Sequence, residues 1–282
     1  MMNALLKFQA QQEEEFLNTI CSVDFADIFQ ANVDFFQDYL QSRFNYSSFS
    51  QRTARAKNPL QQFDDLITYM ALYGYAHYQR IYSIIHEAAV AAQLKKSQNS
   101  NVCVIDYGCG QGIATLAFMD HLIESNIQLK KLKVVLIEPS AVALNRAIHW
   151  IQKKAKHANI ELELITHCCT FDELDENVLV QHINSASCFH LLSNILDMYS
   201  SGTFSLAHLV NIIKKPTSTS TLLAVSPNFF TGNKGFEVLD QLLCPRQVVF
   251  NLHGTIQVTE YRYTTRIMSQ RVAAVRVYVA KI

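Results

Sequence analysis

The sequence has no excess of charge of either sign, because 24 basic side chains balance 24 acidic ones over its 282 residues. It therefore carries no strong nucleic-acid signature, which would be a global positive field. It also has no apolar run near the roughly 18 residues of a membrane span. The first residues lack the basic start, apolar stretch and cleavage site of a secretory signal. We therefore expect a cytoplasmic protein without a membrane partner.

Cysteine pairs with the spacing of a zinc site are also missing. The seven cysteines are scattered and include no C-x-x-C pair. An odd number of scattered cysteines is typical of a protein with reduced thiols. We therefore expect no metal. Apolar residues make up 49% of the chain and charged residues only 17%, a composition that excludes a disordered chain and predicts a compact protein.

The first part of the chain has a helical pattern. Large apolar residues recur at three- and four-residue intervals over residues 24–44, which predicts a helix, and residues 43–57 resemble a loop. Asn58 and Pro59 predict the N-cap and first position of a long second helix, in which Gly74 marks a kink or a close approach. We interpret residues 1–97 as a helical N-terminal extension or lid.

Strands and helices alternate in residues 98–282, a pattern typical of βαβ units and a parallel sheet buried on both faces. After residue 226 the sequence is rich in β-forming residues without long helices, so we expect antiparallel strands at one edge. The predicted strands are Val102–Tyr107, Leu132–Glu138, Ile160–Cys168, Ala186–Leu192 and Thr221–Ser226, then Gln247–Leu252, Thr259–Ile267 and Val272–Ala280. The segment from Ser226 to Gly235 resembles a mobile loop.

A glycine loop connects the first strand to the first helix of this part. Gly108, Gly110 and Gly112 would let ligand atoms approach the backbone at the carboxyl end of the strand. The N-terminus of the following helix adds free N–H groups and partial positive charge. The dinucleotide fingerprint G-x-G-x-x-G would need glycine where the chain has Ile113, so the loop fits NAD poorly.

The second strand ends in an acid. Glu138 is placed to accept hydrogen bonds from ribose hydroxyls, and Ser140 can cap the next helix. The alternative to a ligand-binding loop is that the three glycines only make a tight turn. The alternative to a ribose contact is that Glu138 is a surface glutamate before a turn.

The segment from Ile105 to Gly112 resembles motif I of the class I S-adenosylmethionine (SAM)-dependent methyltransferases, an acid followed by G-x-G-x-G. The distance to the segment Leu136–Ser140 also matches that superfamily. The resemblance covers residues 102–280 and implies an α/β fold: a seven-stranded Rossmann-like sheet, mostly parallel with antiparallel edge strands. It implies SAM as the cofactor, with the loop around its methionine part, Asp106 near its ammonium group and Glu138 on its ribose.

The third and fourth strands should complete the site. By resemblance, Thr170 and Phe171 would lie beside the adenine, although the acid common there in the family is missing and the nearest, Asp172, comes late. Ser193 and Asn194 would face the methyl group, or Asn194 would cap the next helix. The full set of expected cofactor-binding residues is Asp106, Tyr107, Gly108, Cys109, Gly110, Gly112, Glu138, Pro139, Ser140, Thr170, Phe171, Ser193 and Asn194.

The acceptor side of the site is poorly defined by the sequence. Catalysis by alignment needs no dedicated base, and the weak catalytic candidates are Asn194, His190 and Tyr73. A lone histidine in an apolar strand is more often a core residue, and a tyrosine of a packed helix is as often structural. No (D/N)-P-P-(Y/F) motif follows the fourth strand, which disfavours methylation of base amino groups.

The sequence thus predicts a SAM-dependent methyltransferase whose acceptor, a small molecule, a protein or RNA, is unidentified. The alternative is a SAM-binding but catalytically inactive module with a regulatory or assembly role. A nucleotide-dependent oxidoreductase is disfavoured by Ile113. No oligomeric state follows from the sequence.

Overall fold

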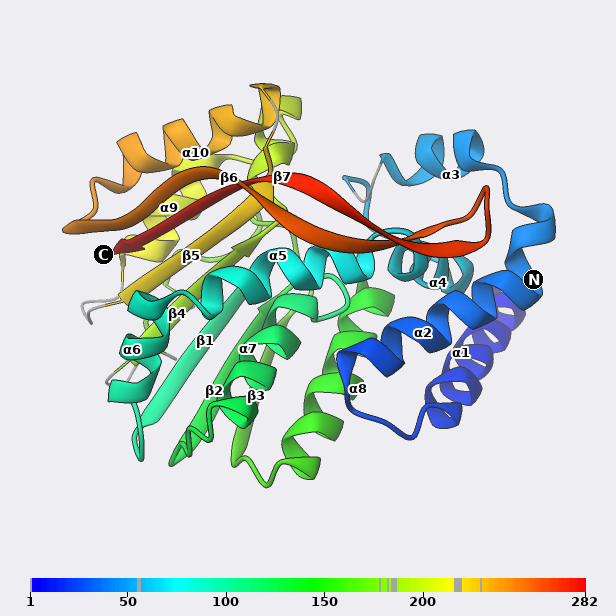
Figure 1. Ribbon diagram of the computed structural model, residues 1–282, viewed down its shortest axis with the longest axis horizontal. Helices are drawn as coiled ribbons and strands as arrows, with labels where there is room; N and C mark the ends of the chain where they lie inside the picture. The colour runs from blue at the N-terminus through cyan, green and yellow to red at the C-terminus, as the bar shows by residue number, and fades with distance from the viewer. Residues whose placement is uncertain are drawn as a thin grey trace.

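The computed structural model describes residues 2–54, 57–177, 179–181, 183, 187–215, 220–228 and 230–282. Its centre is a seven-stranded sheet in the order β3-β2-β1-β4-β5-β7-β6 (Figure 1). The first five strands pair in parallel, whereas β7 is antiparallel to both β5 and β6. The predicted α/β fold, a mostly parallel Rossmann-like sheet with antiparallel edge strands, is confirmed. The strands are β1 Asn101–Tyr107, β2 Lys131–Ile137, β3 Leu162–His167, β4 Ser187–Ser193, β5 Ser220–Pro227, β6 Gln247–Arg262 and β7 Ile267–Lys281.

The helices form a group at one end of the molecule and layers on the two faces of the sheet (Figure 1). Among the described helices, none combines the length and hydropathy that crossing a bilayer requires. The α-helices are α1 Met2–Thr19, α2 Phe25–Phe35, α3 Tyr46–Thr53, α4 Phe63–Tyr69, α5 Tyr75–Ile85, α6 Ala88–Lys96, α7 Ile113–Glu124, α8 Ala141–His157, α9 Leu206–Lys214 and α10 Phe230–Leu243. Segments Phe36–Leu40 and Met70–Gly74 are π-helical, and Gln41–Arg43 and Leu196–Ser201 are 3₁₀-helical.

Two hydrophobic cores cover the two faces of the sheet, because successive side chains of a strand point to opposite sides. Val102 and Val104 of β1 pack with the apolar faces of α2, α5, α7 and α8. Cys103, Ile105 and Tyr107 pack on the other face with α9 and α10. Residues between Phe16 and Leu94 therefore share a core with the sheet.

The interpretation of residues 43–57 as a loop is wrong, because α3 lies within them. The Asn45 side chain accepts a hydrogen bond from the Ser48 amide at 2.9 Å, which caps this helix, and Phe49 is buried. Asn58 does not cap the following helix either. Its amide donates to the Arg52 carbonyl at 2.9 Å, and α4 begins only at Phe63.

The close approach predicted at Gly74 is confirmed. The residue ends the π-helical segment between α4 and α5, and any side chain there would collide with the Met70 sulfur. A π-helical turn inside an α-helix rotates the side chains that follow it relative to those before it. Such turns are common at functional sites.

The end of the chain forms one long hairpin instead of the three predicted strands. β6 and β7 enclose the turn that falls inside the predicted strand Thr259–Ile267. The hairpin extends beyond the sheet and over the N-terminal helices (Figure 1), where Gln41 donates to the Tyr263 carbonyl at 2.5 Å and accepts from the Tyr261 hydroxyl at 2.6 Å.

The segment predicted as a mobile loop, residues 226–235, is largely helical. Pro227 still belongs to β5, and α10 starts at Phe230. Phe229 of that segment and Ala186 of the predicted fourth strand lie outside the described residues.

Candidate functional site

A cavity of about 910 Å³ opens at the carboxyl ends of the parallel strands. Its wall combines the glycine loop after β1, the ends of β2 and β4, and the helical segment from Tyr69 to Arg80. Of the expected cofactor-binding residues, those that line the cavity are Asp106, Gly108, Cys109, Gly110, Glu138, Pro139, Thr170, Phe171, Ser193 and Asn194. Tyr107, Gly112 and Ser140 are not among its described lining residues.

The glycine loop has a backbone that only glycine adopts without strain at several positions. Gly108, Gly110 and Gly112 have φ values of +63°, +53° and +82°. A Cβ on Gly110 would meet no atom within 4 Å, whereas one on Gly112 would lie 3.0 Å from the Ala147 Cβ of α8. Gly110 therefore exposes the backbone to the cavity, and Gly112 lets α8 pack closely.

Asp106, at the end of β1, is a fully buried carboxylate in the cavity wall. Its Oδ2 accepts from the Thr115 hydroxyl at 2.8 Å and the Thr115 amide at 3.2 Å. Its Oδ1 is buried and has no hydrogen-bond partner in the described part of the chain. Burial raises the pKa of Asp106 to about 7, partly offset by the two hydrogen bonds from Thr115.

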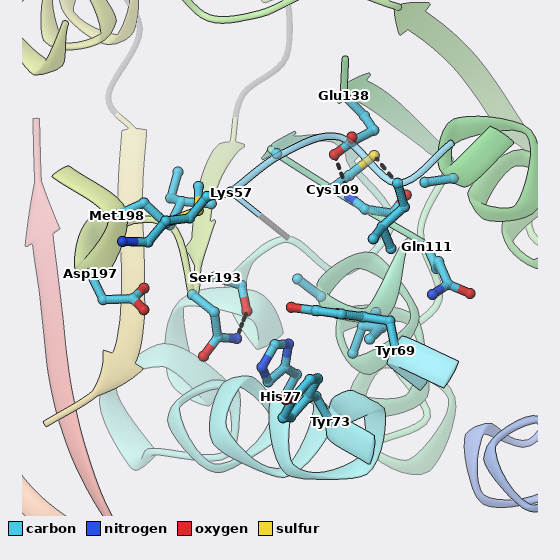
Figure 2. Close-up of a pocket in the computed structure, with 18 of the residues that line it drawn as sticks. Lys57, Tyr69, Tyr73, His77, Cys109, Gln111, Glu138, Ser193, Asp197 and Met198 are labelled. Carbon is cyan, nitrogen blue, oxygen red and sulfur yellow. Dashed lines mark hydrogen bonds between the residues drawn. The ribbon is translucent and has the colours of Figure 1, made fainter. Parts of the chain in front are cut away.

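Glu138, directly after β2, is held by the backbone. One oxygen accepts from the Gly110 amide at 2.9 Å (Figure 2), and the other accepts from the Ser140 amide at 2.9 Å. Burial raises its pKa, and these two hydrogen bonds oppose the shift. Each carboxylate oxygen keeps a second lone pair for a ligand hydroxyl. As predicted, the Ser140 side chain caps α8, accepting from the Ala143 amide at 3.1 Å.

The wall after β3 has no free acid. Thr170 donates to Glu173 through its amide and hydroxyl at 2.9 and 2.8 Å. Asp172 accepts from the Ser205 amide at 2.9 Å, at the start of α9. Phe171 is buried, packs edge-on against Phe204 at 5.1 Å and leaves a flat apolar surface in the cavity wall.

Asn194, after β4, adopts a left-handed backbone with φ of +58°. Its amide nitrogen donates to the Ser193 hydroxyl at 3.0 Å (Figure 2), and its Oδ1 is buried without a partner among the described residues. The alternative role of Asn194 as a helix cap is wrong, because the following 3₁₀ helix has Ile195 at its N-cap position. A buried side-chain oxygen without a partner, on a residue with a left-handed backbone at a cavity wall, is typical of a binding residue.

His190 does not reach the cavity. It lies inside β4, fully buried, with its Nδ1 2.9 Å from the Tyr107 hydroxyl. Burial lowers the pKa of His190 to about 3. The predicted contact of Tyr107 with a cofactor and the catalytic role of His190 are therefore replaced by a pair in the core beneath the glycine loop.

One helical face supplies the opposite wall of the cavity. Tyr69, Tyr73, His77 and Arg80 follow each other at three- and four-residue spacing and all line the cavity. The Tyr73 hydroxyl lies 3.1 Å from that of Tyr46. Figure 2 shows the rings of Tyr69, Tyr73 and His77 side by side, on the other side of the cavity from Cys109 of the glycine loop and Glu138 after β2. Burial lowers the pKa of His77 to about 3, so its ring is neutral at pH 7.

Several charged residues of the wall were not predicted from the sequence. Asp197 lies across the cavity from Glu138, on the same side as Lys57 (Figure 2), and accepts from the Ser226 hydroxyl at 3.3 Å. Burial raises the pKa of Asp197. Glu260 and Arg271 reach the cavity from the hairpin as an ion pair of 2.6 Å.

A buried arginine connects the glycine loop to the N-terminal helices. Arg146 of α8 is fully buried and donates to Gln111 at 2.9 Å, to Asn32 at 3.2 Å and to both carboxylate oxygens of Glu13 at 2.6 and 2.5 Å. Gln111 in turn donates to the Leu66 carbonyl at 3.1 Å. The Arg146 guanidinium therefore connects α1 and α2 to the glycine loop, and Gln111 connects α4 to it.

No protein-family model and no curated protein matches the chain. In structure it is similar to a candidate class I SAM-dependent methyltransferase from Listeria monocytogenes, with 13% identity, 87% of this chain and 71% of that chain covered, and a TM-score of 0.41. It is also similar to a SAM-dependent methyltransferase from Agrobacterium tumefaciens, with 12% identity, 71% and 62% covered and a TM-score of 0.38. A third similar structure is spermidine synthase from Thermotoga maritima, with 10% identity, 74% and 59% covered and a TM-score of 0.36. These likenesses are distant, and the strand order of the sheet alone defines the fold.

Proposed function

We propose that the protein binds SAM in this cavity and transfers its methyl group to a second ligand. The observation that carries the proposal is the pair of buried carboxylates, Asp106 and Glu138, on either side of the exposed backbone of Gly110. SAM has a net positive charge, an ammonium group and a ribose with two hydroxyls. A cavity with two acids at neighbouring strand ends is suited to those groups.

The residues present fit the cofactor at its two polar ends. The unpartnered Oδ1 of Asp106 is a buried acceptor that an ammonium group would satisfy. Glu138 is oriented by the Gly110 and Ser140 amides before any ligand arrives, so its remaining lone pairs are fixed in direction for the ribose. Phe171 provides an apolar surface for the adenine.

When bound, SAM would supply an electrophilic methyl group with its own leaving group. The protein then has to align the acceptor and exclude water, an effect worth roughly 7–11 kcal/mol in well-oriented reactions. Ser193 and Asn194 would orient the reacting groups from β4. Residues 1–97 would act as the lid, because Tyr69 and Tyr73 close the cavity opposite the glycine loop. Cys109 would stay a neutral thiol, since burial raises its pKa well above the ordinary value.

Calorimetry with SAM, S-adenosylhomocysteine (SAH) and NAD tests the cofactor. We expect SAM and SAH to bind and NAD not to, and Glu138→Ala to weaken SAH binding by at least tenfold, since hydrogen bonds to a charged group contribute about 1.5–3 kcal/mol each. Binding of NAD alone would refute the proposal, and an unchanged dissociation constant in Glu138→Ala would remove Glu138 from the ribose role.

Methyl transfer is tested separately with labelled SAM. Fractions of cell extract that contain small molecules, proteins or RNA are incubated with the protein, and label is followed in each. Transfer into one fraction shows the activity and names the acceptor class. Intact SAM binding without transfer into any fraction would instead identify a SAM-binding module without activity.

A further inference from the structure

Arg80 is a buried cation that has no ion-pair or hydrogen-bond partner among the described residues. Only 6% of the residue is exposed, and it lines the cavity. Within the described part of the chain its side chain makes no ion pair and no hydrogen bond, and its Nε is buried and unsatisfied. Leaving a guanidinium unpaired in the protein interior costs several kcal/mol. Such a group is retained where a ligand completes it.

The acids around Arg80 are engaged elsewhere. Glu260 holds Arg271 at 2.6 Å, and Asp197 accepts from Ser226 at 3.3 Å. Both act on Arg80 only through longer-range attraction, while Arg271 repels it. Among the described residues, the guanidinium of Arg80 therefore has no contacting acceptor, and its donors match an oxyanion in two-point geometry.

Arg80 stands at the end of the helical wall that lies farther along the chain. Tyr69 stands at its other end, and its hydroxyl feels the charges of Asp197, Arg80 and Glu138, in decreasing order of strength. Arg80 comes eleven residues later, on the order of 15 Å along the helix axis at 1.5 Å per residue. The wall between them is aromatic: the Tyr69 and Tyr73 rings are 5.2 Å apart and the Tyr73 and His77 rings 6.3 Å.

The size of the cavity also bears on the acceptor. Its volume of about 910 Å³ lies near the top of the roughly 300–1,000 Å³ range of ligand pockets. It can therefore hold a nucleoside-sized cofactor together with a small second molecule.

We propose that Arg80 is an anion subsite, and that the methyl acceptor is a small molecule with a flat apolar body and a carboxylate or phosphate end that pairs with Arg80. The body lies against Tyr69, Tyr73 and His77, and the anionic end contacts the Arg80 guanidinium. This inference rests on the proposed function, because it assigns the second half of the same cavity.

The experiment uses the full chain saturated with SAH. Benzoate, phenyl phosphate and the neutral benzyl alcohol are titrated by calorimetry into the wild type, Arg80→Met and Arg80→Lys. Arg246→Met is the matched control, because it removes the same charge from an exposed position outside the cavity. SAH affinity and the thermal midpoint are measured for every variant.

We expect at least one of the two anions to bind the wild type and Arg246→Met at least tenfold more tightly than it binds Arg80→Met. Benzyl alcohol should bind more weakly than that anion, and Arg80→Lys should be intermediate because it keeps the charge but loses the fork. Preference for benzoate or for phenyl phosphate names the anionic group.

Two results would overturn the subsite. One is equal anion affinity in the wild type and Arg80→Met, and the other is no preference of the wild type for either anion over benzyl alcohol. In both cases SAH binding still stands, so the subsite fails alone. If the wild type does not bind SAH at all, the proposed function itself has failed.

Discussion

Asp106 should make both stability and cofactor binding depend on pH near neutrality. Its carboxyl is fully buried, and its pKa is raised from 3.8 to about 7. The folded state therefore holds a proton that the unfolded state has already released between these two values. Stability falls as the pH rises through this window, by about 4 kcal/mol in total at 1.36 kcal/mol per pKa unit. Asp106→Asn should remove this fall.

The affinity for SAH should change with pH in the opposite direction and rise as the pH rises. An ammonium group pairs with the ionised carboxylate, and with a pKa of about 7 the ionised fraction rises roughly 20-fold between pH 5.5 and 7.5, which lowers the apparent Kd by the same factor. Asp106→Asn presents an amide N–H to the ammonium instead of Oδ1, so its affinity should be lower throughout and nearly flat with pH.

The assay is calorimetry with SAH at pH 5.5, 6.5 and 7.5, together with urea unfolding at the same pH values. Glu138 also has a raised pKa and could contribute to the pH dependence of binding. Because Asp106→Asn still contains Glu138, any pH dependence that the variant keeps measures the contribution of Glu138. A wild-type Kd that changes less than about threefold, or a variant with the same pH dependence as the wild type, would refute the role of Asp106.

Three further predictions concern the frame of the site. Gly110→Ala should fold, at a cost of about 1–2 kcal/mol for its positive φ, but should bind SAH at least tenfold more weakly in calorimetry. Gly112→Ala should lose more stability in urea unfolding, because its Cβ would lie too close to Ala147. Arg146→Met should lower the free energy of unfolding by about 3–5 kcal/mol, because it leaves the buried Asn32 and Gln111 oxygens and the half-buried Glu13 carboxylate without their donor. A smaller loss than in Gly110→Ala would contradict the contacts described. Asn194→Gly should keep or raise the thermal midpoint by relieving the left-handed backbone, yet reduce methyl transfer, and unchanged transfer would exclude Asn194 from the reaction.

The donor half of the cavity could be predicted from the sequence because its signals are local. A buried strand, a glycine loop and a helix follow each other within about two dozen residues, and Asp106 and Glu138 stand at the ends of neighbouring strands. Parallel strands bring such ends to the same edge of the sheet. The geometry of those two residues agrees with that placement.

His190 has the core position that a lone histidine in an apolar strand more often has, and its place along the strand explains why it is not a catalytic residue. The residue lies in the middle of β4, three positions before Ser193, and its side chain points to the face shared with Tyr107. Residues that reach a ligand stand at the carboxyl end of a strand, so this distance could have excluded His190.

Arg80 and His77 were missed because a helical period does not tell a core-facing stripe from a cavity-facing one. The face that carries Tyr69 and Tyr73 continues to both residues, and a charge on an otherwise apolar stripe was the available signal. That face lines a cavity instead of packing in the core because the hairpin and the glycine loop lie opposite it, and both are distant from it in the sequence. Asn58 shows the reverse case, in which a clear local cap signal is overridden by α3 and its contacts.

The contact between Gln41 and Tyr263 joins residues 222 positions apart in the chain. Closing so long a loop is entropically slow, and contacts of this kind form late in folding. During synthesis the parallel strands can pair before the final hairpin has left the ribosome, whereas the hairpin side of the cavity, with Glu260 and Arg271, cannot exist until the last strand is complete. The nascent chain therefore acquires the glycine loop first and the enclosed cavity last.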